Sequence, residues 1–234
     1  KINIKNFFIG LIIFFIGFSK KVFFADNISL IVENGYNFYN SLNFLDSWLT
    51  SIGFTLQLYF DFSGYVDMAI GTALLFNLNL PNNFNSPYKS SSMILFWQKW
   101  HITLSNFFQT YLFYPVIKNF NIQNYFFIML AILFVFLING LWHGPSWLFV
   151  IFGLINGIGV IFNHLYKKFI NYKIPFFISV IMTFLYFNIS LIFFRSPEMN
   201  VAIGLLKTMF GFNGFNLYLN LEYGFELIIY FIAI

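Results

Sequence analysis

The chain has 234 residues, of which 59% are hydrophobic and 9% are charged, and its formal net charge is +4. Soluble domains carry about 25% charged residues, so this composition excludes an ordinary water-facing globule and indicates a protein solvated largely by lipid. The sequence contains no cysteine, which excludes disulfides, thiolate metal ligands and a thiol nucleophile. Its lysines lie singly or in pairs between apolar runs, which predicts membrane-flank anchors and no nucleic-acid partner.

The first predicted elements are apolar runs long enough to cross a membrane, for which about 20 mostly apolar residues are needed. Residues 4–18 form a clear span, whereas residues 45–60 and 65–80 are weaker candidates because polar groups interrupt them. Asp61 and Asp67 fall within this weaker region. A carboxylate at the centre of a span costs about 2.5–3.5 kcal/mol, so such residues usually pair or line a wet cavity.

Two interpretations of Asp61 stay open. It can hold a backbone, Trp, Tyr or His group of another helix, or it can contact a substrate directly. Ser63 and Gly64, which follow it, permit a tight break and close packing of the chain. Asp61 and Ser63 are therefore candidates for substrate binding or structural support.

The next segment, residues 90–116, is predicted to be one amphipathic helix. Trp97, Trp100 and Leu104 recur at helical spacing on one side, and Lys99 lies among polar residues on the other. The serines at 90–92 form a plausible start for this helix. Trp97 and Trp100 are further candidates for substrate binding or support.

Three strong spans follow, at residues 125–141, 147–165 and 174–194, and a further apolar run at 223–234 is cut off. After the third of these spans, Ser196, Pro197 and Glu198 predict the N-cap and first turn of a short helix that ends near Phe210. The elements together predict an all-α, polytopic transmembrane helical bundle with amphipathic helices. We expect a single membrane domain over residues 1–234, incomplete at both ends.

The stretch NGLWHGPSWLFV places His143 between two of these spans. Gly140 and Gly144 bracket the histidine and Pro145 ends the helix, so the backbone is predicted to break at membrane depth. Such a break is tolerated only where it is buried in protein or lines a watered cavity. A lone membrane histidine is ordinarily a satisfied hydrogen-bonding group, but at a wet break a neutral imidazole can act as a general base.

The other histidines and a metal site allow different interpretations. His164 precedes two lysines at the end of a span, where a histidine is ordinarily an interface residue without a catalytic role. His101 and His143, with Asp61, could ligate zinc, but no closely spaced ligand pair supports this, so no metal site is predicted. Asn139 and Trp142, in the same stretch as His143, join the candidates for substrate binding or support.

Four motifs occur in order: LYFDFSGYVDMAIG, PNNFNSPY, FWQKWHITLSNFFQTYLFYPV and NGLWHGPSWLFVIFGLING. Together they resemble the membrane-bound O-acyltransferase (MBOAT) family, nearest its alginate O-acetylation branch and the relatives that acetylate peptidoglycan. The resemblance runs from about Gly10 to about residue 197. The arginine of a glycine-rich basic stretch usual in the alginate branch is absent here, where the sequence reads VIKNFNIQN.

The resemblance implies a transmembrane acyltransferase with a central tunnel, which a thioester donor enters from the cytoplasm and an acceptor hydroxyl from the other side. His143 matches the histidine of the family's W-H-G motif and would be the catalytic base. His101 matches the second motif position and would stabilise the oxyanion or position the donor. Acetyl-CoA or another acyl thioester would be the donor substrate, with no bound cofactor.

We therefore expect acetyl transfer to a cell-envelope polysaccharide in the bacterial inner membrane, directly or through a periplasmic acetyltransferase-like or esterase-like partner. The alternatives are D-alanyl transfer to a teichoic acid-type acceptor, and a non-catalytic subunit that relays or transports acetyl groups. The lysine pairs at 20–21 and 167–168 enclose four candidate spans, so both pairs are predicted to be cytoplasmic and the turn at His143 to open outward.

Overall fold

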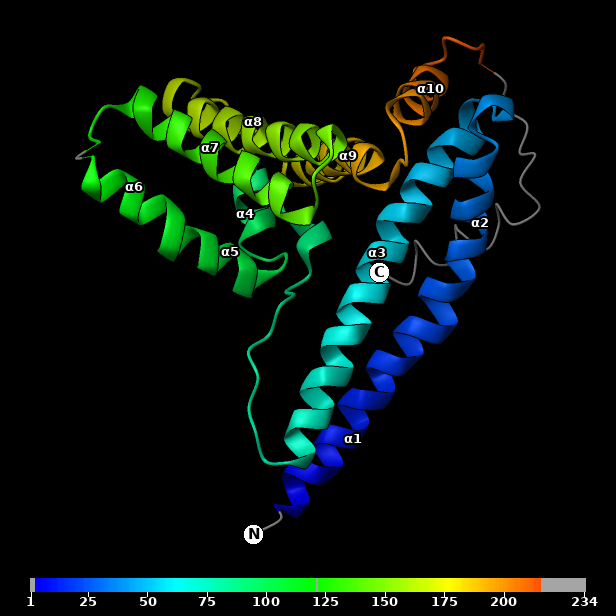
Figure 1. Cartoon of the computed structure of the whole chain (residues 1–234), viewed down its shortest axis with the longest axis vertical. Coiled ribbons are helices and arrows are strands. Elements are labelled where there is room, and N and C mark those ends of the chain that lie inside the picture. The colour runs from blue at the N-terminus through cyan, green and yellow to red at the C-terminus, as the bar shows by residue number, and fades with distance from the viewer. Residues whose placement is uncertain (1–2, 121, 216–234) are drawn as a thin grey trace. The chain divides into compact units, whose positions relative to one another are not determined.

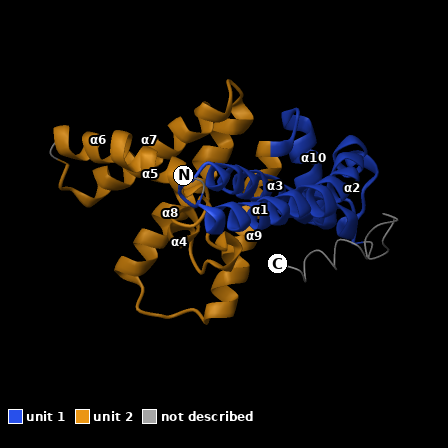
Figure 2. Ribbon diagram, turned by 90° about the horizontal axis from the view of Figure 1, so that it is seen from below, with its two compact units in different colours: residues 1–82, 195–234 blue, residues 83–194 orange. Residues whose placement is uncertain are grey.

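The computed structural model describes residues 3–120 and 122–215, and its regular elements over these residues are all helices. The chain divides into two compact units, residues 1–82 with 195–234 (unit 1) and residues 83–194 (unit 2), shown in Figure 2. Among the described residues, four helices are long and apolar enough to cross a membrane: Ile4–Asn37, Tyr125–His143, Trp147–Phe169 and Phe176–Arg195. The four strong predicted spans are confirmed, and residues 223–234 lie outside the described part.

Unit 1 is built on a long helical hairpin (Figure 1). Helix α1 (Ile4–Ser19) passes through the π-helical turn η1 (Lys20–Ala25) into α2 (Asp26–Asn37), and α3 (Phe44–Leu75) returns beside them. The prediction of two separate spans at 45–60 and 65–80 was wrong, because α3 runs without a break through Ser63 and Gly64. The count of four spans between the lysine pairs is wrong for the same reason, and the orientation based on it stays a prediction.

Glycines let α1 and α3 touch along their backbones. A Cβ atom at Gly71 would lie 2.5 Å from the carbonyl oxygen of Gly10 and 2.6 Å from the amide nitrogen of Phe14. A Cβ at Gly17 would lie 2.5 Å from the carbonyl oxygen of Gly64. Small residues at such crossings allow the close van der Waals packing on which helix association in lipid depends. Gly64 therefore packs a continuous helix and does not break it.

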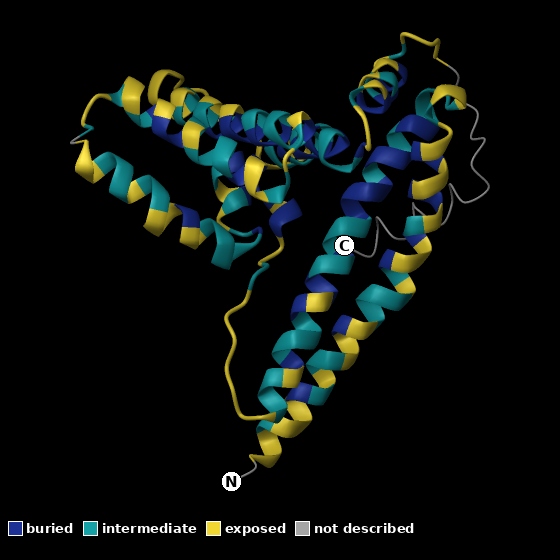
Figure 3. Cartoon of the chain, in the orientation of Figure 1, coloured by how far each residue is buried: buried dark blue, intermediate teal, exposed yellow. Residues whose placement is uncertain are grey.

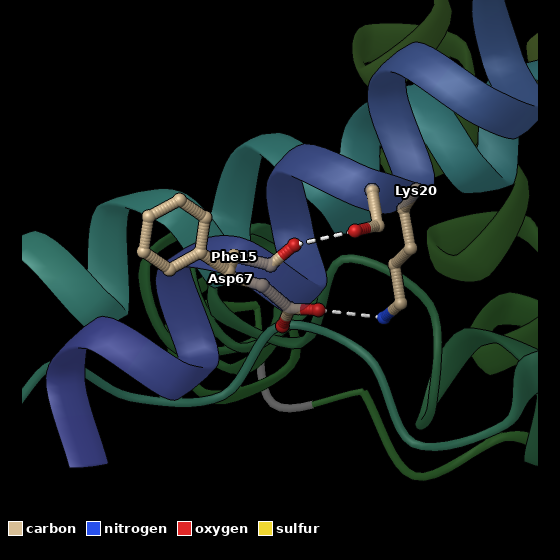
Figure 4. A network of polar contacts seen from close by, with 4 residues as sticks. Phe15, Lys20 and Asp67 are labelled. Carbon is tan, nitrogen blue, oxygen red and sulfur yellow. Dashed lines mark hydrogen bonds and ion pairs between the residues drawn. The ribbon is translucent and has the colours of Figure 1, made fainter. Parts of the chain in front are cut away.

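Ion pairs also join the two helical arms of this hairpin, α1–η1–α2 and α3. Lys20 Nζ lies 2.6 Å from Asp67 Oδ2 (Figure 4), and Lys21 Nζ lies 2.7 Å from Asp61 Oδ1 and 2.9 Å from Asp26 Oδ1. The predicted partner of Asp61, a Trp, Tyr, His or backbone group, was therefore wrong, and the lysines are not simple flank anchors. Pairing opposite charges offsets the cost of placing either one beside lipid.

The remainder of unit 1 consists of η2 (Tyr39–Ser41) and α10 (Met199–Met209). Trp48 on α3 donates from Nε1 to the carbonyl oxygen of Met209 at 2.9 Å, which fixes the end of α10 to α3. The predicted short helix after the last span is confirmed, but its N-cap is Glu198, two residues later than Ser196. Ser196 is buried, so its side chain belongs to the interior of the fold and not to the helix cap.

Unit 2 contains two long hairpin helices, α7 (Tyr125–His143) and α8 (Trp147–Phe169), followed by α9 (Phe176–Arg195). A Cβ at Gly140 would collide with the carbonyl oxygen of Phe149, so this glycine allows α7 and α8 to approach closely. Helices α8 and α9 are joined by a buried hydrogen bond, in which Asn156 Nδ2 donates to Ser190 Oγ at 3.1 Å.

The predicted single helix over residues 90–116 was wrong. Residues 87–119 instead form η3 (Pro87–Lys89), α4 (Met93–Trp97), α5 (Ile102–Phe108), the π-helical turn η4 (Gln109–Phe113) and α6 (Tyr114–Asn119). Ser92 caps α4 by accepting from Leu95 N, which confirms the serine start signal. Trp100 is buried beside Phe96 and Phe187, and its ring centroid lies 5.8 and 5.5 Å from theirs. Figure 3 shows how burial varies along the helices of the chain.

Candidate active site

The break between α4 and α5 is centred on His101, which adopts a left-handed conformation with φ of 43° and ψ of 56°. This conformation costs a non-glycine residue about 1–2 kcal/mol, so surrounding contacts must hold it. The extended segment before η3 provides them. Asn83 O accepts from Ile102 N at 3.0 Å, and Asn85 N donates to Lys99 O at 3.0 Å.

The side chain of Asn83 adds to these backbone contacts. Its Oδ1 accepts from Thr103 N at 3.1 Å and from Thr103 Oγ1 at 2.7 Å, and it lies 3.3 Å from His101 Nδ1. The imidazole of His101 is half-buried, and this burial lowers the pKa of His101 below its ordinary value of 6.5, against the opposing effect of a hydrogen bond with its own backbone. His101 is therefore neutral at pH 7.

His143 is the last residue of α7, immediately before the turn into α8. Its ring lies among aromatic rings, with centroids 4.9 Å from Trp142, 4.9 Å from Phe194 and 5.9 Å from Phe152. No side chain or backbone group among the described residues hydrogen-bonds to its imidazole. His143 is thus positioned by packing, and its nitrogens stay available to a ligand. His101 lies close enough to interact with it electrostatically.

A cavity of about 360 Å³ lies between α4, α5, η4, α7 and α8. This volume is within the range of small-molecule sites. Most of its lining is apolar, and its polar lining side chains are Trp97, Gln98, Ser105, Asn106, Gln109, Asn139 and His164. Neither His101 nor His143 lines it, but Gln98 precedes His101 by three residues and Asn139 precedes His143 by one helical turn, on the same face of α7.

Two polar atoms in this lining are buried without a partner among the described residues. They are Oδ1 of Asn139, a residue only 6% exposed, and Nε1 of Trp97. An unpaired buried polar group costs about 1–3 kcal/mol, so natural proteins retain one mainly where a ligand or water completes it. One of the two atoms is an acceptor and the other a donor, so the cavity suits an occupant that both donates and accepts hydrogen bonds.

The other predicted site residues lie elsewhere. Trp100 lies in the aromatic core of unit 2, and Trp142 is 57% exposed beside His143. Asp61 and Ser63 belong to α3 in unit 1, where Asp61 is ion-paired and the buried Ser63 Oγ has no partner within the described residues. Within residues 3–120 and 122–215, no three His, Asp or Glu side chains are grouped to hold a metal ion.

The sequence alone did not indicate Asn83 or five polar residues of the cavity lining, which are Gln98, Ser105, Asn106, Gln109 and His164. The sequence predicts His164 to be an interface residue without a catalytic role, whereas the structure places it in the lining. Asn83 binds the His101 loop, and its motif PNNFNSPY contributes only to the family resemblance. For His164 a helical projection could have given a signal, because it follows the lining residue Val160 by four positions on α8.

The chain is similar in sequence to several known proteins. The chain is 42% identical over 220 residues to a peptidoglycan O-acetyltransferase of Helicobacter pylori, covering 92% of this chain and 41% of that protein. It is 33% identical over 217 residues to a protein of Pseudomonas aeruginosa named for alginate O-acetylation, covering 92% and 41%. It is 28% identical over 172 residues to a teichoic acid D-alanyltransferase of Bacillus subtilis, covering 71% and 42%.

The chain thus spans about two fifths of the length of these relatives. Four apolar helices of spanning length also make it a multi-pass membrane protein. The profile of the membrane-bound O-acyltransferase family matches residues 2–205, which include most of both units; a single domain over residues 1–234 stays a prediction. By this match and by its relatives, the chain belongs to the membrane-bound O-acyltransferase family.

Proposed function

We propose that this chain forms the reaction centre of a bacterial inner-membrane O-acetyltransferase that acts on a cell-envelope polysaccharide of the peptidoglycan or alginate type. The observation that carries the proposal is His143, whose imidazole has no hydrogen bond among the described residues and lies one helical turn from the unpaired Asn139. The names of the relatives support the acetyl group and the class of acceptor.

In the proposed reaction the donor is a cytoplasmic thioester, acetyl-CoA or another carrier. His143 accepts the proton of the acceptor hydroxyl as its oxygen bonds to the acyl carbon. The carbon–sulfur bond then breaks, and its electron pair leaves with the thiolate, which can take the proton from His143. General-base catalysis of this kind contributes about 10²- to 10⁴-fold.

D-alanyl transfer is the second candidate within the family, because a teichoic acid D-alanyltransferase is among the relatives. A D-alanyl group carries an ammonium, which in a low-dielectric site needs a carboxylate or a similar partner. None of the described residues that line the cavity is acidic. The lining therefore favours the neutral acetyl group.

The test uses the full-length protein in its membrane and measures the O-acetyl content of the glycan and the consumption of acetyl-CoA. His143→Ala and His143→Gln should both reduce transfer at least about 100-fold, because glutamine keeps hydrogen bonding but lacks basicity. Folded yield and thermal midpoint should stay near those of the wild type. Near-normal transfer by the glutamine variant would contradict the role of His143 as base.

A second arm separates direct transfer from a relay to a periplasmic acetyltransferase-like or esterase-like partner. Purified full-length protein is given acetyl-CoA and glycan without any other protein. Acetylated glycan indicates direct transfer. Consumption of acetyl-CoA that depends on His143 but yields no acetylated glycan indicates a relay. Acetyl-CoA that is not consumed, where another acyl thioester is, would identify a carrier as the donor.

A further inference from the structure

The loop that carries His101 holds one side of its imidazole against a fixed acceptor. His101 Nδ1 lies 3.3 Å from Asn83 Oδ1. The orientation of this amide is set independently, because Thr103 N, which can only donate, binds the same atom at 3.1 Å. The atom that faces His101 is therefore the amide oxygen, an acceptor, and not the NH₂ group.

A neutral imidazole carries its proton on one nitrogen and a lone pair on the other. Since the group opposite Nδ1 can only accept, the proton lies on Nδ1 and the lone pair lies on Nε2. The left-handed backbone at His101 and the hydrogen bond from Ile102 N to Asn83 O keep the side chains of His101 and Asn83 opposite each other. The opposite tautomer would place two lone pairs against each other.

We propose that Asn83 is a positioning residue of the reaction centre, which fixes the Nδ1–H tautomer of His101 and so leaves Nε2 as the nitrogen that can only accept a hydrogen bond. This inference rests on the proposed function. It changes the role expected for His101, because a neutral imidazole with its proton on Nδ1 has no N–H at Nε2 to offer an oxyanion. A substrate group that contacts Nε2 must therefore be a donor, such as the hydroxyl of the incoming glycan, and groups other than His101 must stabilise the oxyanion.

The charge state agrees with this assignment. Burial lowers the pKa of His101, so the neutral form, for which the tautomer matters, is present at pH 7. His143 on α7 is one titratable group that interacts electrostatically with His101. Lys99, two residues before His101, approaches this segment through its backbone carbonyl, which accepts from Asn85 N.

The experiment measures the tautomer directly, by nitrogen NMR of the ¹⁵N-histidine-labelled full-length protein in nanodiscs at pH 7.5, with the His101 signals assigned from a His101→Gln sample. The wild type should show a protonated Nδ1 and an unprotonated Nε2. Asn83→Ala should shift His101 toward the Nε2–H tautomer. Asn83→Asp keeps an acceptor opposite Nδ1 and should restore the wild-type tautomer.

Transfer kinetics give the second readout. A wrong tautomer in a catalytic imidazole can cost about 10⁴-fold. Since the Asn83 contact is neutral and 3.3 Å long, we expect Asn83→Ala to lower kcat by about 10- to 100-fold with KM for the thioester unchanged. Asn83→Asp should recover most of kcat and move the acidic limb of the pH profile to higher pH, because a carboxylate stabilises the imidazolium.

Thr103→Val is the matched control. It removes the 2.7 Å bond from Thr103 Oγ1 to Asn83 but leaves the contact with His101. It should keep the Nδ1–H tautomer, kcat and the pH profile. An Nε2–H tautomer in the wild type, or an Asn83→Ala protein with unchanged tautomer and kcat, would overturn the proposal. Neither NMR result depends on transfer, so a failure of the proposed function, seen as active His143→Gln, is distinguishable from failure of this one.

Discussion

The charged side chains of the hairpin in unit 1 and the polar side chains that line the cavity in unit 2 differ in their partners. In the hairpin, Lys20 and Lys21 are each paired with a carboxylate from α3 at 2.6–2.7 Å. In the cavity, the buried polar atoms of Asn139 and Trp97 have no partner among the described residues. Charges are thus neutralised where they join two helices. Unpaired polar atoms also occur outside the cavity, at Ser63 Oγ for example, so it is their position in the cavity lining that makes Asn139 and Trp97 candidates for binding a ligand.

The largest expected effect comes from replacing Asn139, an unpaired residue of the cavity lining. Asn139→Leu removes an unpaired acceptor, so folded yield and thermal midpoint should stay the same or rise, whereas transfer per folded molecule should fall about 10- to 100-fold. Asn156→Leu is the matched control, because Asn156 is fully buried and its Oδ1 is also unpaired, but its Nδ2 donates to Phe152 O and Ser190 Oγ. It should lower the thermal midpoint. A destabilised Asn139→Leu protein with normal turnover would reverse the interpretation.

For the hairpin, the test compares two carboxylates, Asp61 and Asp26, that both pair with Lys21. Asp61 joins α3 to Lys21, whereas Asp26 lies only five residues from Lys21 along the same helical run. Since the Asp61 side chain is 47% exposed, its loss should cost between a surface pair and a buried one, about 1–2 kcal/mol. Asp61→Asn should therefore lower the thermal midpoint in detergent more than Asp26→Asn, with turnover per folded molecule unchanged. Equal losses would show that Asp61 does not fasten the hairpin.

The smallest expected effect is a pH dependence of stability. Because the pKa of His101 is lowered in the folded state, the unfolded chain binds more protons than the folded chain below about pH 6.5. The contribution of His101 to stability is thus full above pH 6.5 and declines as the pH falls toward its folded pKa. The thermal midpoint should decrease between pH 7 and pH 5.5, and less so in His101→Gln. Identical slopes for the two proteins would exclude His101 as a source.

The four strong spans and the short helix after them could be predicted from the sequence because length and apolar composition alone specify them. The continuity of α3 could not, since the Ser63–Gly64 pair permits both a break and a close crossing. Its outcome depends on Gly17, 47 positions away, which contacts Gly64. The pairing of Lys21 with Asp61 is equally non-local, and no local pattern in the sequence reports it.

For the candidate site, the sequence indicated His143 and Asn139 because their motif places polar groups beside a predicted backbone break. It indicated Trp97 by helical spacing and His101 by the resemblance of its motif to the family. It missed the break at His101 itself. The pattern of apolar residues does not reveal a left-handed residue that is not glycine. Here the helical spacing of apolar residues continues across His101, at Trp97, Trp100 and Leu104. The contacts from Asn83 decide the conformation there, and these appear only once residues 83 and 101 are seen side by side.

The ion pairs of the hairpin also bear on how the protein is made. Lys20 and Asp67 are 47 residues apart, so at a synthesis rate of about 5–20 residues per second the ammonium emerges about 2–9 s before its carboxylate. During that interval the flexible lysine side chains can reach the lipid headgroups, which an aspartate is too short to do. Because the lysines are made first, we expect α1 to keep its ammonium groups at the headgroups until α3 has been synthesised, after which the ion pairs neutralise both charges as the hairpin closes.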